Sequence, residues 1–127
     1  MNRNTLCKTE RLRSKLIIEK MFAGGAKSFS MFPLRVVFIP LESLESSAAI
    51  LISVSKRRFK QAVKRNRVKR QIREAYRKNK QYLLHTLEEK KLKLAIAFIY
   101  LDDKLITSVE MEKKIQIVLV RLVEQFP

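Results

Sequence analysis

Between Phe59 and Leu84 the chain contains neither proline nor glycine, and apolar residues recur through this stretch at helical spacing. Five of them fall within one stripe of a 3.6-residue wheel: Val68, Ile72, Ala75, Tyr76 and Leu83. The remaining positions are mostly charged. The sequence therefore predicts a long amphipathic helix that docks with one face and leaves the other in solvent.

Two further helices are predicted, one near each end of the chain. Ser14 is placed to cap a short helix over residues 15–23, which Gly24 and Gly25 end. Thr107 followed by Glu110 makes a capping box, and apolar residues then keep helical spacing to the end.

Three segments have the composition of strands. Residues 31–39 are rich in β-branched and aromatic side chains and are bounded by Pro33 and Pro40. Residues 48–55 alternate in hydrophobicity, and the polar segment before them predicts a hairpin with the preceding strand. Residues 92–101 are apolar enough to form a buried strand.

This order of elements predicts a small α+β domain. Its two layers are a mixed sheet of about four strands and three helices, with the long helix crossing between the second and third predicted strands. A length of 127 residues suits one modest core, so residues 1–127 are expected to form a single domain.

Positive charge is concentrated on the predicted long helix and the turn before it. Residues 56–80 hold thirteen Lys or Arg and one acid, Glu74, which leaves a net +12 of the chain's +16 in this segment. Asn66, Arg70, Arg73 and Arg77 share one face, with Lys69 and Lys80 at its margin. A run of charges on a helix is usually a solvated face with opposite charges interspersed, but acids are missing here.

That excess of charge predicts a polyanionic partner. Nucleic acid is the first candidate and an anionic membrane surface the second. Membrane insertion would need the apolar stripe that the core requires, so RNA binding without membrane contact is favoured. A planar guanidinium can donate two hydrogen bonds to one phosphate.

The composition also limits compartment and chemistry. Cys7 is the only cysteine, which excludes an internal disulfide, and neither a signal peptide nor an apolar run of about 20 residues is present. A cytoplasmic location is expected. His85 is the lone histidine, and Asp102 and Asp103 are expected to form a turn, so no catalytic set, metal site or small-molecule cofactor site is predicted in the polypeptide.

Two segments resemble one known family. Ser53-Val-Ser-Lys56, followed by Ala62-Val-Lys-Arg-Asn-Arg-Val-Lys-Arg-Gln-Ile-Arg-Glu-Ala-Tyr76, is similar to the strand and Arg-Asn-Arg helix of ribonuclease P protein subunits. Arg11-Leu-Arg13 and Phe22-Ala-Gly-Gly25 resemble the first helix of that family. The resemblance implies a ribosomal-protein-like fold with a left-handed βαβ crossover, although right-handed crossovers predominate in general.

The resemblance also implies a function. The chain would be the accessory subunit of an endoribonuclease that removes the 5′ leader of precursor tRNA, inactive alone, with a catalytic RNA that supplies the active site and binds Mg²⁺. Positions matching the surface for the catalytic RNA are Arg65, Asn66, Arg67, Lys69, Arg70 and Arg73. Positions matching the leader site, between the first helix and the sheet, are Phe22, Phe38, Ser53, Ser55 and Lys56.

Two features depart from the family's pattern. The turn over residues 57–61 is one residue longer and lacks glycine, and Ile18 stands where the first helix usually has an aromatic residue. Phe22 and Phe38 could equally belong to the core. The alternative function is that of a structural, ribosomal-type RNA-binding protein.

Overall fold

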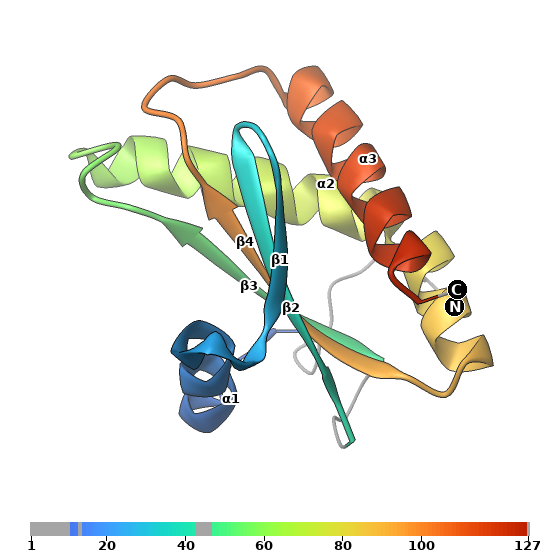
Figure 1. Ribbon diagram of the computed structural model, residues 1–127. Helices are drawn as coiled ribbons and strands as arrows, with labels where there is room; N and C mark the ends of the chain where they lie inside the picture. The colour runs from blue at the N-terminus through green and yellow to red at the C-terminus, as the bar shows by residue number, and fades with distance from the viewer. Residues whose placement is uncertain (1–10, 13, 43–46, 127) are drawn as a thin grey trace.

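A four-stranded sheet in the order β1-β2-β4-β3 forms the centre of the fold (Figure 1). The computed structural model describes residues 11–12, 14–42 and 47–126. β1 pairs antiparallel with β2, β2 antiparallel with β4, and β3 parallel with β4. The strands are β1 (Lys27–Met31), β2 (Leu34–Leu41), β3 (Ala48–Val54) and β4 (Lys93–Tyr100).

Helices lie on both sides of this sheet, with α2 and α3 packed together on one side and α1 on the other (Figure 1). The helices are α1 (Lys15–Lys20), which continues as the turn η2 (Met21–Gly25), α2 (Ala62–Glu89) and α3 (Ser108–Glu124). The predicted α+β class, with three helices and a mixed sheet of four strands, is confirmed. α2 connects the parallel strands β3 and β4; the expected left-handed sense of that crossover stays a prediction.

The region predicted as one strand over residues 31–39 is a hairpin of two strands. Pro33 is not a strand boundary but lies in the turn between β1 and β2, where its carbonyl accepts a hydrogen bond from the Leu101 amide at 2.7 Å. β1 was missed because it is short and alternates serine with Phe29 and Met31. Pro40 is accommodated within β2 because it lies beyond the last β1 pair, Lys27 with Phe38.

The predicted hairpin between residues 31–39 and 48–55 is wrong, because β4 lies between β2 and β3. The physical reason is the composition of β4. Residues 94–98 of this strand are buried on both faces, so it needs a neighbour on each edge and a layer on each side. Sequence alternation fixes which face a residue takes, but it does not fix which strand lies beside it.

Each face of the sheet has its own apolar cluster. The larger one joins the sheet to α2 and α3 and is centred on Val36, Ile50, Ile96, Phe98, Tyr76, Ile115 and Leu119. The smaller one joins the opposite face to α1 through Leu12, Met21, Val37, Ile39, Ala49, Ala95 and Ala97. The alanines of the second face let α1 approach the sheet closely. Because α1 is short, it does not cover the whole of that face.

The predicted helix caps are present. The Ser14 hydroxyl accepts a hydrogen bond from the Ile17 amide at 3.3 Å, and the Thr107 hydroxyl accepts one from the Glu110 amide at 3.1 Å. Gly24 has a φ of 98°, a left-handed conformation that glycine adopts without strain and that turns the chain from the first helix toward β1. This turn fixes the position of Phe22 relative to the sheet.

Candidate nucleic-acid interface

The single acid of the basic segment is already engaged. The Glu74 carboxylate accepts a hydrogen bond from the Arg77 guanidinium at 2.7 Å, one helical turn away. This bond holds the pKa of Glu74 below its ordinary value, so the carboxylate stays ionised at neutral pH. The carboxylate also attracts Lys78 and Arg73, but one acid can offset only a small part of the charge of thirteen cations in this segment.

The apolar stripe of α2 fixes the direction of those cations. All five residues predicted for the stripe are buried, and the Tyr76 ring lies 5.9 Å from that of Phe98 in β4. Lys80, expected at the margin of the basic face, is instead only 2% exposed. The basic face is therefore narrower at its C-terminal end than the wheel predicts.

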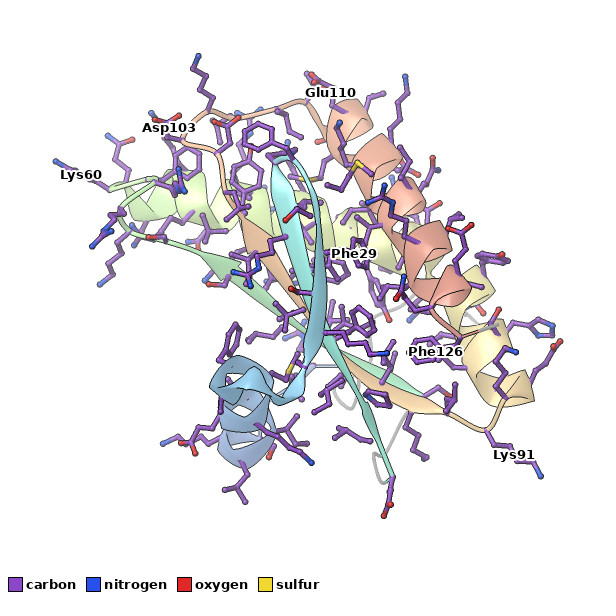
Figure 2. All side chains as sticks on the ribbon, in the orientation of Figure 1. Phe29, Lys60, Lys91, Asp103, Glu110 and Phe126 are labelled. Carbon is purple, nitrogen blue, oxygen red and sulfur yellow. The ribbon has the colours of Figure 1, made fainter. Side chains whose placement is uncertain are left out.

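Arg65 holds the turn that leads into α2. Its guanidinium donates hydrogen bonds to the carbonyls of Phe59 at 2.7 Å and Lys60 at 2.9 Å. The Phe59 ring is buried, with its centroid 6.0 Å from that of Tyr100. The lengthened, glycine-free turn is thus anchored by one apolar ring and one arginine. Figure 2 shows Lys60 in this turn and Lys91 beyond the far end of α2.

Asn66 is exposed, and the four remaining predicted positions on α2 divide between two neighbours. Arg67 and Arg70 line a pocket between α2 and α3. Lys69 and Arg73 line a second hollow along the outer edge of β3, where Arg11 joins them. Arg11 is placed there by a parallel bridge to Ile50, next to a hydrogen bond of 2.8 Å from the Leu12 amide to the Ile50 carbonyl.

Two residues of the predicted leader site, Phe22 and Ser53, lie on the α1 side of the sheet. Phe22 is 53% exposed, next to buried Met21. Ser53 lies beyond the part of that face that α1 covers, in a row of paired residues that crosses the sheet through Ile99 and Arg35 to Ser30. Arg35 is exposed and adds positive charge to this row. Arg35 could not be predicted from the sequence as part of this site, because one arginine in an apolar strand carries no periodic signal.

Phe38 is wrongly assigned to the leader site. Its side chain is 1% exposed and points to the α2 and α3 side, where its ring makes edge contacts at 6.0 Å with both Phe29 and Phe126. Figure 2 shows these two rings, one on β1 and one just after α3. The residue of β2 that faces the other way is Val37. Alternation along a strand means that an error of one position changes the face.

Ser55 and Lys56 follow the end of β3. The Ser55 hydroxyl accepts a hydrogen bond from the Arg57 amide at 3.0 Å, and its carbonyl accepts one from the Phe59 amide at 3.2 Å. Ser55 therefore shapes the turn, whereas Lys56 is exposed.

Two other sequence predictions concern groups outside this interface. Asp102 accepts a hydrogen bond from the Lys104 amide at 3.2 Å, as expected of a turn residue, and His85 is exposed beside Glu89. Within residues 11–12, 14–42 and 47–126, every helix is too short or too polar to cross a bilayer. The same part of the chain brings no three His, Cys, Asp or Glu side chains together as a metal site.

Comparison with known proteins identifies the family. The family model described as Ribonuclease P matches residues 6–122. A ribonuclease P protein component from Porphyromonas gingivalis is 42% identical over 123 residues, covering 96% of this chain and 89% of that relative. A second, from Chlorobium phaeobacteroides, is 34% identical over 110 residues, covering 80% of this chain and 75% of its own length.

The chain belongs to the ribonuclease P protein family. It is the protein subunit of ribonuclease P, an accessory subunit of the endoribonuclease that matures tRNA 5′ ends, and RNA is its partner. This assignment replaces the alternative of a ribosomal-type structural protein.

Solved structures agree with the fold of this ribonuclease P protein. The RNase P protein of Staphylococcus aureus superposes with a TM-score of 0.73 at 21% identity, covering 94% of this chain and all of that one. That of Thermotoga maritima gives a TM-score of 0.70 at 22% identity, with 88% and 96% covered.

The two phenylalanines predicted for the leader site should respond differently to truncation. Phe38→Ala should lower the free energy of unfolding by about 3–5 kcal/mol because it empties a packed core site. Phe22→Ala should change it by less than about 1 kcal/mol because that ring is half exposed. Urea denaturation of both variants measures the difference, and equal small losses would contradict the burial of Phe38.

Proposed function

We propose that this ribonuclease P protein binds two RNAs on separate surfaces. The basic surface of α2 binds the catalytic RNA subunit, and the open part of the sheet face beside α1 binds the 5′ leader of precursor tRNA. Residues 1–127 act as one RNA-binding domain in the cytoplasm.

The RNA-subunit surface comprises Asn66, Arg67, Lys69, Arg70 and Arg73, with Arg65 holding the turn that positions them. The leader surface comprises Phe22, Ser53 and Lys56, with Ser55 shaping the turn and Arg35 added to the row.

The uncompensated charge of α2 carries the first half of the proposal. Like charges one turn apart on a helix cost a few tenths of a kcal/mol per pair, which an RNA backbone would relieve. The buried stripe holds the helix against the sheet, so the backbone positions from which its arginine side chains extend are fixed. Fixed donors suit a folded RNA whose phosphates also have fixed positions.

The exposure of Phe22 beside a polar row supports the second half. An exposed aromatic ring can stack on an unpaired base for about 1–3 kcal/mol. Ser53 and Arg35 can donate hydrogen bonds to phosphate oxygens on the same face, and Lys56 adds a mobile charge at its edge. A single-stranded leader offers unpaired bases and phosphates together, as a duplex does not.

In this proposal the RNA subunit carries out the chemical step and binds most of the catalytic Mg²⁺. The contribution of the polypeptide is to bind and orient both RNAs. Neutralising phosphates near the junction of leader and tRNA would reduce the repulsion between two polyanions and lower the Mg²⁺ concentration that cleavage requires.

A cleavage assay tests the function directly. Purified protein is added to catalytic RNA and precursor tRNA at near-physiological Mg²⁺, and release of the 5′ leader is followed by gel electrophoresis. We expect faster cleavage than with RNA alone, and no cleavage with protein alone. The absence of any gain over RNA alone would refute the proposal.

The α2 surface is tested by salt dependence. Arg70→Ala with Arg73→Ala should weaken binding to the catalytic RNA and flatten its log–log salt slope by up to about 0.9 per lost duplex phosphate contact. Lys90→Ala with Lys113→Ala removes the same charge from exposed sites outside the proposed surface and is the control. Equal slopes for the two double variants would mean that Arg70 and Arg73 face water.

The leader surface is tested by selectivity. Phe22→Leu should weaken binding of precursor tRNA about fivefold or more while leaving mature tRNA unchanged, since only the precursor has bases to stack. Phe32→Leu is the control because Phe32 is 64% exposed in the β1–β2 turn, outside the proposed leader surface. Equal losses for precursor and mature tRNA would remove Phe22 from the leader site.

A further inference from the structure

A pocket of about 500 Å³ opens between α2 and the first turns of α3, on the side of α2 away from the β3 edge. Its volume falls in the roughly 300–1,000 Å³ range of sites that hold small organic groups. Its lining includes two carboxylates and three cations as well as uncharged side chains: Glu74, Glu112, Arg67, Arg70, Lys78, Gln71, Ser108 and Val109. Its composition differs from that of the β3-edge hollow, which has no acid in its lining.

Gln71 gives this pocket a fixed inner wall. Its side chain is 8% exposed, and its amide nitrogen donates to the Ile106 carbonyl at 2.9 Å and to the Ser108 hydroxyl at 3.3 Å. These two bonds set the orientation of the amide. Its oxygen is buried and accepts no hydrogen bond from the residues that the structure describes. A buried acceptor without a donor is unfavourable, so a donor that reached this oxygen would be stabilised.

Glu112 supplies a half-buried carboxylate to the lining of this pocket. Its carboxylate accepts a hydrogen bond from the Asn79 amide at 3.1 Å, and Asn79 in turn accepts one from Gln116 at 3.1 Å. This chain of bonds holds the carboxylate in place while leaving lone pairs on it, since a carboxylate offers about four acceptor sites.

The mouth of the pocket carries cationic donors, in contrast to the acceptor groups of Gln71 and Glu112. Arg67, Arg70 and Lys78 are exposed there, and the one exposed acid beside them, Glu74, is bonded to Arg77. Val109, 66% exposed, supplies an apolar wall. Cations at the mouth attract phosphate. A base can stack on a guanidinium plane or on an apolar side chain, and its donor groups can hydrogen-bond to the acceptors of the pocket.

We infer that this pocket holds an unpaired guanine of the catalytic RNA, whose Watson–Crick edge donates to Glu112. The inference rests on the proposed binding of that RNA by α2. Guanine is the base whose edge carries two adjacent donors, N1–H and the N2 amino group, and these match the two oxygens of one carboxylate. Adenine and uracil alternate donors with acceptors on that edge, and an acceptor facing Glu112 would be repelled.

The carboxylate itself argues for base recognition over simple charge attraction. A surface that only neutralised phosphates would gain nothing from a fixed carboxylate, which repels a polyanion. A carboxylate that accepts two base donors gains specificity in return for that repulsion. Removal of the Glu112 charge should therefore weaken RNA binding if the carboxylate binds a base, and strengthen it if the surface only neutralises phosphates.

Binding and chemical protection test the inference. Glu112→Gln should weaken the affinity for the catalytic RNA about tenfold, the size of one good bidentate base contact. Glu124→Gln, in the last turn of α3, removes the same charge outside the pocket and should leave the affinity unchanged or slightly tighter. Kethoxal, which modifies N1 and N2 of unpaired guanines, should show one guanine protected by the unsubstituted protein and reactive again with Glu112→Gln.

Val109→Trp provides a second variant that does not disturb the Asn79 bond. It fills the mouth from an exposed position, so the fold should be retained, as thermal unfolding checks, and the same guanine should become reactive. If the protein binds the RNA but no guanine shows protection that depends on these substitutions, the inference is overturned and the proposed function stands. If the protein does not bind the catalytic RNA, the proposed function itself fails.

Discussion

The packing of α2 against the sheet is the interaction on which the rest of the molecule depends. A segment with a net charge of +12 is held on a folded surface by a few buried side chains, among them Val68, Ile72, Tyr76 and Leu83. Burying each such side chain is worth about 1.5–3 kcal/mol, whereas each like-charge pair on a helix costs a few tenths. The apolar stripe therefore outweighs the repulsion, and the helix can present cations that an isolated peptide could not keep ordered.

The elements that pack beside α2 then place its cations in different surroundings. On one side it meets α3, and on the other it passes along the edge of β3, so cations that are adjacent in sequence enter different surroundings. Arg67 and Arg70 lie beside fixed acceptors, whereas Lys69 and Arg73 lie beside Arg11 and strand backbone. Arg65 is taken up by the turn before the helix. A surface that is uniform in composition is thus divided into parts suited to different features of one folded RNA.

Much of the fold could be predicted from the sequence because its signals are local. Helical spacing identified the buried stripes of α2 and α3, alternation separated the two faces of β3, and apolar content marked β4 as buried. Ser14 and Thr107 marked helix starts through bonds that span only three residues. The Arg-Asn-Arg segment placed the chain in its family because a long run of residues is shared. Each of these signals depends on residues close together in the chain.

The sequence by itself determined the class of the domain, the basic helix and the kind of partner that such a charge needs. Only the tertiary structure decided that β4 separates β2 from β3, that Phe38 lies in the core while Val37 faces the other way, and that Glu112 and Gln71 meet at one pocket. The reason is the range of the interactions. Strand order and pockets arise from contacts between distant segments, which compete for burial only once the chain is folded.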